Sequence, residues 1–156
     1  MFRLICILFG YGFGCIQTAY IAGKLFYKID IREHGSGAAG ATNTVRVMGM
    51  KTGLAVFVCD MAKAVLAFFV CSLMYRDGGS VIPGMYAGLG VVMGHNFPFY
   101  LKFKGGKGVA SSLGILVSVD WRLFLMDSAC GLLALLLHRY VSPYESAQRF
   151  QETRCR

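Results

Sequence analysis

The chain has 156 residues, of which 56% are hydrophobic and only 15% are charged, and its mean hydropathy is +0.55. Soluble domains of this size are usually ~45–50% apolar and ~25% charged. The composition therefore argues against a soluble globular domain and predicts an integral membrane protein, and the length predicts a single domain. The net charge is +8, so the positions of the basic residues carry information about topology.

Five hydrophobic segments predict an all-α fold, a polytopic membrane helical bundle. They run over residues 2–22, 52–74, 81–93, 109–119 and 123–137. The first two are long enough to cross ~30 Å of hydrocarbon, whereas the last two, at ~12–15 residues, indicate tilted short helices or half-helices. The third can extend into the polar stretch that follows it. We expect a membrane domain over residues 1–141 and a polar, non-membrane tail over 142–156.

The N-terminal segment is expected to remain as a membrane helix, because Arg3 is its only charge and no small-residue cleavage site follows it. The six cysteines form no CxxC pair and five lie in apolar runs, which argues against a disulfide framework or a metal site. We expect no metal site, and we also expect no cofactor and no nucleic-acid partner.

Basic residues are concentrated in alternate connections between the segments. Twelve of the sixteen fall in the loop 23–51, the loop 97–107 and the C-terminal tail, against three on the opposite side. The twelve are Lys24, Lys28, Arg32, Arg46, Lys51, Lys102, Lys104, Lys107, Arg139, Arg149, Arg154 and Arg156. Because cytoplasmic loops carry an excess of lysine and arginine, this predicts an outward N-terminus and both glycine-rich loops on the cytoplasmic side.

The first glycine-rich loop, residues 35–46, reads GSGAAGATNTVR. Its small residues allow tight turns, Ser36, Thr42 and Asn43 offer neutral hydrogen-bonding groups, and Arg46 offers a guanidinium suited to phosphate. The alternative is a flexible connector with an incidental arginine. The presence of a second loop of similar chemistry on the same face favours an anion site.

The second loop, residues 94–108, reads GHNFPFYLKFKGGKG. Lys104 and Lys107 flank Gly105 and Gly106, whose backbone N–H groups can approach an anion closely. The positive-inside rule or contact with anionic lipid explains the lysines but not the glycine pair. A nucleotide P-loop does not fit, because Lys107 is followed by glycine and no strand precedes the loop.

Three further polar residues are candidates for the site. His95 can donate to an oxyanion, accept a proton, or serve as a structural hydrogen-bonding residue at a helix end. Asp60 and Lys63 are spaced i, i+3 within the second segment, where charges usually face the protein interior. For this pair we favour a structural ion pair beneath the site over direct catalysis.

Together these motifs resemble the bacterial membrane family of acyl-phosphate:glycerol-3-phosphate acyltransferases, of the PlsY type. The first family motif, GSGNxGATNxxR, matches residues 35–46 except at Ala38, and the third, GHxFPxFxxFKGGKG, matches residues 94–108 except at Tyr100. The second, an Asp-x-x-Lys-Gly element, matches Asp60 and Lys63 but has Ala64 in place of glycine. The family fold has seven membrane helices, and the resemblance ends after Val141, so we expect a member altered or cut short at its C-terminus.

The resemblance implies transfer of an acyl group from acyl phosphate to the sn-1 hydroxyl of glycerol 3-phosphate, giving lysophosphatidate for phospholipid synthesis. The partners would be these two substrates and membrane lipid, in the bacterial cytoplasmic (inner) membrane. The implied catalytic residues are Ser36, Arg46, Lys107 and His95. The implied phosphate-binding residues are Gly37, Thr42, Asn43, Lys104, Gly105 and Gly106. The alternatives are a non-catalytic or truncated protein of the same family and, third, a small anion transporter.

Overall fold

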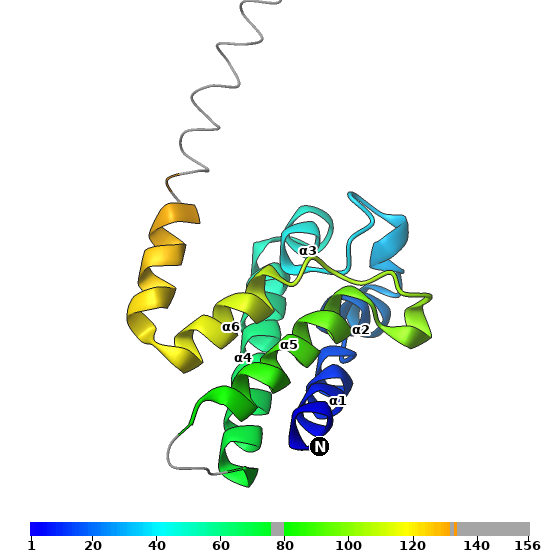
Figure 1. Cartoon of the computed structure of the whole chain (residues 1–156). Helices are drawn as coiled ribbons and strands as arrows, with labels where there is room; N and C mark the ends of the chain where they lie inside the picture. The colour runs from blue at the N-terminus through cyan, green and yellow to red at the C-terminus, as the bar shows by residue number, and fades with distance from the viewer. Residues whose placement is uncertain (76–79, 132, 134–156) are drawn as a thin grey trace, which may run out of the picture. The chain divides into compact units, whose positions relative to one another are not determined.

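Figure 1 shows the computed structural model of the chain, which describes residues 1–75, 80–131 and 133. The chain divides into two compact units, Met1–Asp120 and Trp121–Arg156. In the second unit residues 121–131 are helical, within the segment predicted at 123–137. The predicted polar tail, 142–156, lies outside the described residues. Every regular element that the structure describes is helical, which confirms the all-α fold.

The first unit contains both glycine-rich loops. Its elements in chain order are α1 (Phe2–Gly14), α2 (Thr18–Ala22), the π-helical turn η1 (Gly23–Tyr27), the 3₁₀ turn η2 (Ile31–Glu33), α3 (Ala41–Met48), α4 (Met50–Met74), α5 (Ile82–Asn96), the 3₁₀ turn η3 (Phe99–Leu101) and α6 (Val109–Val119). In the described part of the chain, two helical stretches are long and apolar enough to cross a membrane, Phe2–Tyr27 and Met50–Met74.

The first predicted segment is not one continuous helix. The α-helical hydrogen bonding of α1 ends at Gly14, and Gln17 adopts φ −89° and ψ 88° before α2 begins at Thr18. Hydropathy measures how apolar a stretch is and carries no information about backbone continuity, so the break was not predicted. The third segment extends through Asn96, so Gly94 and His95 belong to the last turn of α5 rather than to the loop.

Close contact between α1 and α5 depends on glycine. A Cβ on Gly10 would overlap the carbonyl oxygen of Ala87, and a Cβ on Gly94 would overlap the carbonyl oxygen of Tyr11. Small residues let membrane helices approach until their backbones touch, which strengthens packing where lipid supplies no hydrophobic driving force between helices. This contact fixes the end of α5, where His95 lies, against the first span.

Helix α4 packs against α5 on one side and α6 on another. Ala64, where the family motif has glycine, is fully buried and faces α6. A Cβ on Gly114 would lie 3.1 Å from the Cβ of Ala64 and 2.5 Å from the carbonyl oxygen of Met61. The methyl group of Ala64 is therefore accommodated because α6 has glycine opposite it.

The polar connection predicted as a loop over 23–51 contains regular structure. Residues 41–48 form α3, so Thr42, Asn43 and Arg46 project from a helix and not from an irregular loop. Helix α3 ends where Gly49 adopts φ +89°, a conformation that disfavours other residues, and α4 begins at the next residue. In Figure 1, α3 and the connection between α5 and α6 lie at the same end of the bundle, away from the N-terminus.

Candidate active site

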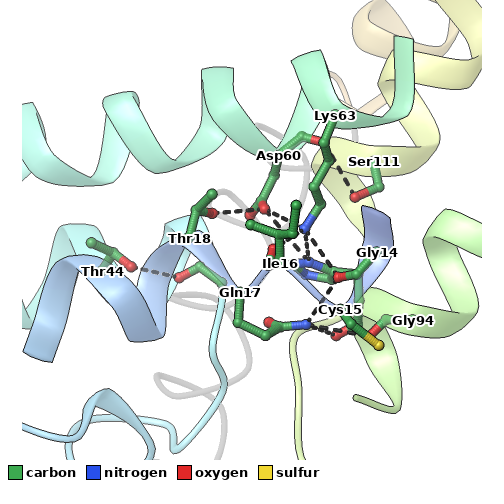
Figure 2. A network of polar contacts seen from close by, with 12 residues as sticks. Gly14, Cys15, Ile16, Gln17, Thr18, Thr44, Asp60, Lys63, Gly94 and Ser111 are labelled. Atoms are coloured by element: carbon green, nitrogen blue, oxygen red, sulfur yellow. Dashed lines mark hydrogen bonds and ion pairs between the residues drawn. The ribbon is translucent and has the colours of Figure 1, made fainter. Parts of the chain in front are cut away.

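Polar side chains from other elements satisfy the backbone where the first span is broken. The ammonium of Lys63, on α4, donates to the carbonyl oxygen of Ile16 at 2.8 Å and to that of Gly14 at 3.4 Å. The hydroxyl of Tyr100 donates to the carbonyl oxygen of Cys15 at 2.7 Å. Irregular backbone at membrane depth is tolerated only where such partners exist. Figure 2 shows Lys63 pointing from α4 toward this segment.

The fully buried side chain of Gln17 joins the break to the end of α5. Its Nε2 donates to the carbonyl oxygen of His95 at 2.8 Å and lies 3.4 Å from the carbonyl oxygen of Gly94. Carbonyl groups in the last turn of a helix find no N–H donor within the helix, so they need donors from elsewhere. Gln17 supplies one and thereby fixes the backbone of His95.

Asp60, Lys63 and His95 form a buried cluster beneath the two loops. The ion pair expected between Asp60 and Lys63 is present, with 2.8 Å between Oδ1 and Nζ, and both side chains are more than 90% buried. The same Nζ lies 3.1 Å from Nδ1 of His95. Oδ1 of Asp60 also accepts a hydrogen bond from Thr18 Oγ1 at 2.7 Å. Ser111 of α6 donates to the backbone carbonyl of Asp60 at 3.3 Å.

Asn43 organises the first glycine-rich loop from within. Its Oδ1 accepts the N–H of Ser36 at 2.9 Å, and its Nδ2 lies 3.0 to 3.2 Å from the carbonyl oxygens of Ile31, His34 and Ala38. The side chain is 2% exposed, and both of its polar ends are engaged by the protein. Asn43 lies in the wall of the site, but its amide shapes the loop and is not a free ligand group.

Gly105 and Gly106 connect the second loop to α5 and to the first loop. The N–H of Gly105 donates to the carbonyl oxygen of Asn96 at 3.1 Å, and the N–H of Gly106 donates to that of His95 at 3.0 Å. The carbonyl of Gly105 accepts the N–H of Ala39 at 3.2 Å. Both N–H groups thus have protein acceptors in this structure. Their expected role in cradling a phosphate stays a prediction.

The absence of a side chain at these glycines serves protein packing. A Cβ on Gly105 would overlap the carbonyl oxygen of His95, and a Cβ on Gly106 would overlap Nε2 of the same histidine. Glycine is required because the loop backbone passes directly over the end of α5. The two glycine-rich loops are thus held together at this point.

A cavity of about 200 Å³ opens between the two loops and the buried cluster. Six of the predicted site residues line it, namely Ser36, Thr42, Asn43, Arg46, His95 and Lys107. Asp60 also reaches its wall, and Phe57, Val109 and Ala110 supply an apolar side. Residues 71 positions apart in the sequence, Ser36 and Lys107, therefore face one space, as the charge topology predicted for the two loops.

The charge of the cavity wall is positive. The side chains of Arg46 and Lys107 form no ion pair with any residue that the structure describes, and the one acidic residue in the wall, Asp60, is already paired with Lys63. Two cations without a protein counter-charge favour an anionic ligand. The apolar residues on one side favour a ligand that also has a hydrocarbon part.

The remaining predicted residues lie outside this cavity. Gly37, Gly105 and Gly106 are in the loops but not in its wall, and Lys63 is not in its wall either. Lys104 lines a separate cavity of about 290 Å³ together with Lys102 and Asp30. There the guanidinium of Arg32, 2.7 Å from the carboxylate of Asp30, holds the pKa of Asp30 below its ordinary value by hydrogen bonding. Arg32 also donates to the carbonyl of Leu101 at 3.1 Å, which joins the two loops a second time.

Sequence reasoning missed Gln17, Thr18, Phe57 and Ser111. Gln17 and Thr18 carried a signal, because they are adjacent polar residues within an otherwise apolar predicted span. Phe57 and Ser111 carried none, since a phenylalanine or serine in a membrane helix is unremarkable until its neighbours are known.

Comparison with known proteins agrees with this architecture. The family model described as glycerol-3-phosphate acyltransferase matches residues 4–147. Glycerol-3-phosphate acyltransferase of Thermoanaerobacter pseudethanolicus is 43% identical over 142 residues, covering 91% of this chain and 70% of the relative. That of Shouchella clausii is 41% identical over 136 residues, covering 87% of this chain and 66% of the relative.

A solved structure is also similar, that of PlsY (YgiH), an integral membrane glycerol 3-phosphate acyltransferase, in its glycerol 3-phosphate form. It aligns with a TM-score of 0.76 at 34% identity, covering 86% of this chain and 66% of that chain. The chain thus spans about two thirds of the length of these relatives.

The helical bundle and its similarity to an integral membrane protein define the class, an integral, multi-pass membrane protein, and its cavity is lined by the two cations Arg46 and Lys107. Together with the family match over residues 4–147, they show which one: the chain belongs to the glycerol-3-phosphate acyltransferase family. The resemblance stated from the two glycine-rich motifs is confirmed.

Proposed function

We propose that this chain transfers a fatty acyl group from acyl phosphate to the sn-1 hydroxyl of glycerol 3-phosphate, giving lysophosphatidate. The observation that carries the proposal is the pair of cations Arg46 and Lys107, which face one cavity from two different loops and have no counter-charge among the residues that the structure describes. Both substrates carry phosphate, so their mutual repulsion must be offset before the reacting atoms can meet. The apolar wall at Phe57 and Val109 suits the beginning of an acyl chain.

In the proposed reaction the sn-1 hydroxyl oxygen attacks the carbonyl carbon of acyl phosphate and forms an ester bond. The bond between the carbonyl carbon and the phosphate oxygen breaks, and the phosphate leaves with the electron pair. The hydroxyl proton passes to a phosphate oxygen, so the products are lysophosphatidate and inorganic phosphate. Because acyl phosphate is already activated, orientation and charge stabilisation supply the main catalytic effects.

Within this proposal Ser36, Arg46 and Lys107 hold glycerol 3-phosphate. The N–H of Ser36 donates to Oδ1 of Asn43, so it is already engaged. The hydroxyl of Ser36 has no partner among the described residues, and it is the group of Ser36 that we expect to bind the substrate. Thr42 adds a second hydroxyl in the wall. The donor phosphate is held by the cations and hydroxyls of the cavity, since the N–H groups of Gly105 and Gly106 are engaged elsewhere.

We further propose that the cavity opens to the cytoplasmic side of the bacterial inner membrane, with the N-terminus outside. The support is the excess of lysine and arginine in the loops 23–51 and 97–107. A cysteine introduced at Lys51 should react with a membrane-impermeant thiol reagent in inverted vesicles but not in intact cells. The reverse labelling pattern would overturn this orientation.

The functional test compares acyl transfer in membranes containing the wild-type chain, Arg46→Ala or Lys107→Ala. Each substitution removes a cation from the cavity wall, so each should abolish transfer from acyl phosphate to glycerol 3-phosphate. Lys51→Ala is the matched control, since it removes an exposed lysine outside the cavity and should leave the rate unchanged. Retained activity in both cavity variants would overturn the residue assignment. Phosphate exchange across vesicles without acyl transfer would instead indicate a transporter.

A further inference from the structure

The contacts of Lys63 determine which nitrogen of His95 carries a proton. A lysine ammonium has three N–H donors and no acceptor. Its three nearest polar neighbours are the carboxylate oxygen of Asp60 at 2.8 Å, the carbonyl oxygen of Ile16 at 2.8 Å and Nδ1 of His95 at 3.1 Å. Two of these are obligate acceptors. The carbonyl oxygen of Gly14 is a fourth neighbour, but it lies farther away, at 3.4 Å. The third donor is therefore directed at the imidazole, the nearer of the two remaining groups.

We propose that Lys63 fixes His95 as the tautomer with a bare Nδ1 and a protonated Nε2, so that His95 donates a hydrogen bond to substrate and does not act as a base. If Nδ1 carried a proton, two N–H donors, that of His95 and that of the Lys63 ammonium, would face each other across 3.1 Å with no acceptor between them. With Nδ1 accepting from Lys63, a neutral imidazole must carry its proton on Nε2. Lys63 is then a positioning residue, and His95 is the group that meets the substrate.

The competing arrangement places a proton between Nδ1 of His95 and the carboxylate of Asp60. That would make Nε2 the acceptor and His95 a candidate base. The distance from Nδ1 to Oδ1 of Asp60 is 3.6 Å, which is too long for a hydrogen bond. The same oxygen already accepts from Thr18 at 2.7 Å and from Lys63 at 2.8 Å. The geometry therefore favours Lys63 as the partner of Nδ1.

The opposite edge of the His95 ring is available to a ligand. His95 lines the cavity, its Nε2 lies against Gly106, and Nε2 has no hydrogen-bond partner among the described residues. A donor at this position can stabilise a substrate oxygen that gains negative charge. The role rests on the proposed function, and in it the hydroxyl proton goes to a phosphate oxygen of the substrate.

The tautomer can be measured without any assay of activity. The chain has three histidines, and in His34 the Nδ1 lies 2.9 Å from the carbonyl oxygen of Asp30, an obligate acceptor. His34 must therefore protonate Nδ1, the reverse of the arrangement proposed for His95. Nitrogen-15 NMR of histidine-labelled protein, at a pH well above ordinary histidine titration, distinguishes the two forms, and His34→Gln and His95→Gln assign the signals.

The proposal expects His95 in the wild-type protein to show a bare Nδ1 and a protonated Nε2. A proton on Nδ1 of His95, alone or with one on Nε2, would overturn it. In Lys63→Met the donor to Nδ1 is lost, so a measurable share of His95 should move its proton to Nδ1. An unchanged tautomer in that variant would overturn the positioning role of Lys63. The wild-type spectrum remains decisive if Lys63→Met fails to fold.

A kinetic comparison tests the donor role itself. A glutamine amide can place an N–H near the position of Nε2 but cannot act as a base, so His95→Gln should keep at least tenfold more kcat than His95→Ala. Equal kcat values in the two variants would overturn the donor role. If the wild-type chain makes no lysophosphatidate at all, the proposed function fails, while the spectrum still decides the tautomer.

Discussion

Replacing Lys63 by methionine tests how much of the fold depends on the buried cluster. Methionine keeps most of the side-chain volume but removes the ammonium, which leaves the carboxylate of Asp60 buried and unpaired (1% exposed). Breaking a buried ion pair by removing one partner costs about 3–5 kcal/mol. The carbonyl oxygen of Ile16 also loses its donor, at about 1–3 kcal/mol for an unsatisfied buried group, and that of Gly14 keeps only its contact with Gln17.

Because these terms overlap, the expected loss in free energy of unfolding is about 4 kcal/mol, which changes the folding equilibrium about a thousandfold. Adding Asp60→Asn to Lys63→Met removes the orphaned charge and should restore about 2 kcal/mol. The assay is reversible unfolding of the purified protein in mixed micelles, by titration with a denaturing detergent. Lys51→Met, at an exposed position on the same helix, is the control and should fall within about 0.5 kcal/mol of wild type.

A loss below about 1 kcal/mol for Lys63→Met would refute this reasoning, because no buried pair with these contacts can be so weakly coupled to the fold. A double variant as unstable as the sum of the two single variants would refute it as well. That result would mean that Lys63 and Asp60 stabilise the bundle independently, through their separate backbone and hydroxyl contacts.

Two further predictions concern packing and the first loop. Gly94→Ala should destabilise the bundle by about 1–3 kcal/mol in the same unfolding assay, because the new methyl group meets the backbone of α1. Gly12→Ala is the control and should not destabilise the bundle, because its methyl group would meet nothing within 4 Å. Equal effects of the two substitutions would contradict the close contact of α1 with α5. Asn43→Ala removes the side chain that joins Ser36 to the backbone of Ile31, His34 and Ala38. The rate of acyl transfer should therefore fall on the order of a hundredfold, and limited proteolysis should cut residues 34–40 faster. Thr42→Ser is the control and should preserve the loop. An uncut loop in Asn43→Ala would contradict its organising role.

The elements that the sequence predicted best are those determined by composition and periodicity. The apolar run over 52–74 became α4, Met50–Met74, and the run over 81–93 became α5. Arg46 and Lys107 were predicted to share a site because charge asymmetry put their loops on one side of the membrane. The cavity brings them together.

The features that the sequence could not predict depend on partners distant along the chain. At the break over residues 15–17, Lys63 and Tyr100 satisfy the carbonyl groups, and Gln17 joins the segment to the end of α5. No hydropathy average contains that information. A glycine pair likewise indicates that something approaches the backbone closely, without saying whether it is ligand or protein. At Gly105 and Gly106 it is the end of α5.

The difference at Asn43 has the same origin. The side-chain amide of an asparagine in a glycine-rich motif can form hydrogen bonds with a bound phosphate or with the backbone of its own loop, and the sequence does not distinguish the two. Only the positions of Ile31, His34 and Ala38 reveal that this amide is saturated by backbone groups. Arg46 and Lys107, by contrast, find no counter-charge in the described part of the chain, so they remain the side chains that we propose bind an anion.

In the proposed reaction the two loops form one site, in which an acyl group passes between two phosphate-bearing substrates. Phosphorus-31 NMR of the purified protein, mixed with acyl phosphate and glycerol 3-phosphate, follows every phosphorus atom of that reaction. We expect the acyl phosphate signal to be replaced by signals of inorganic phosphate and lysophosphatidate in equal amounts. Inorganic phosphate without lysophosphatidate, or no change in the spectrum, would contradict it.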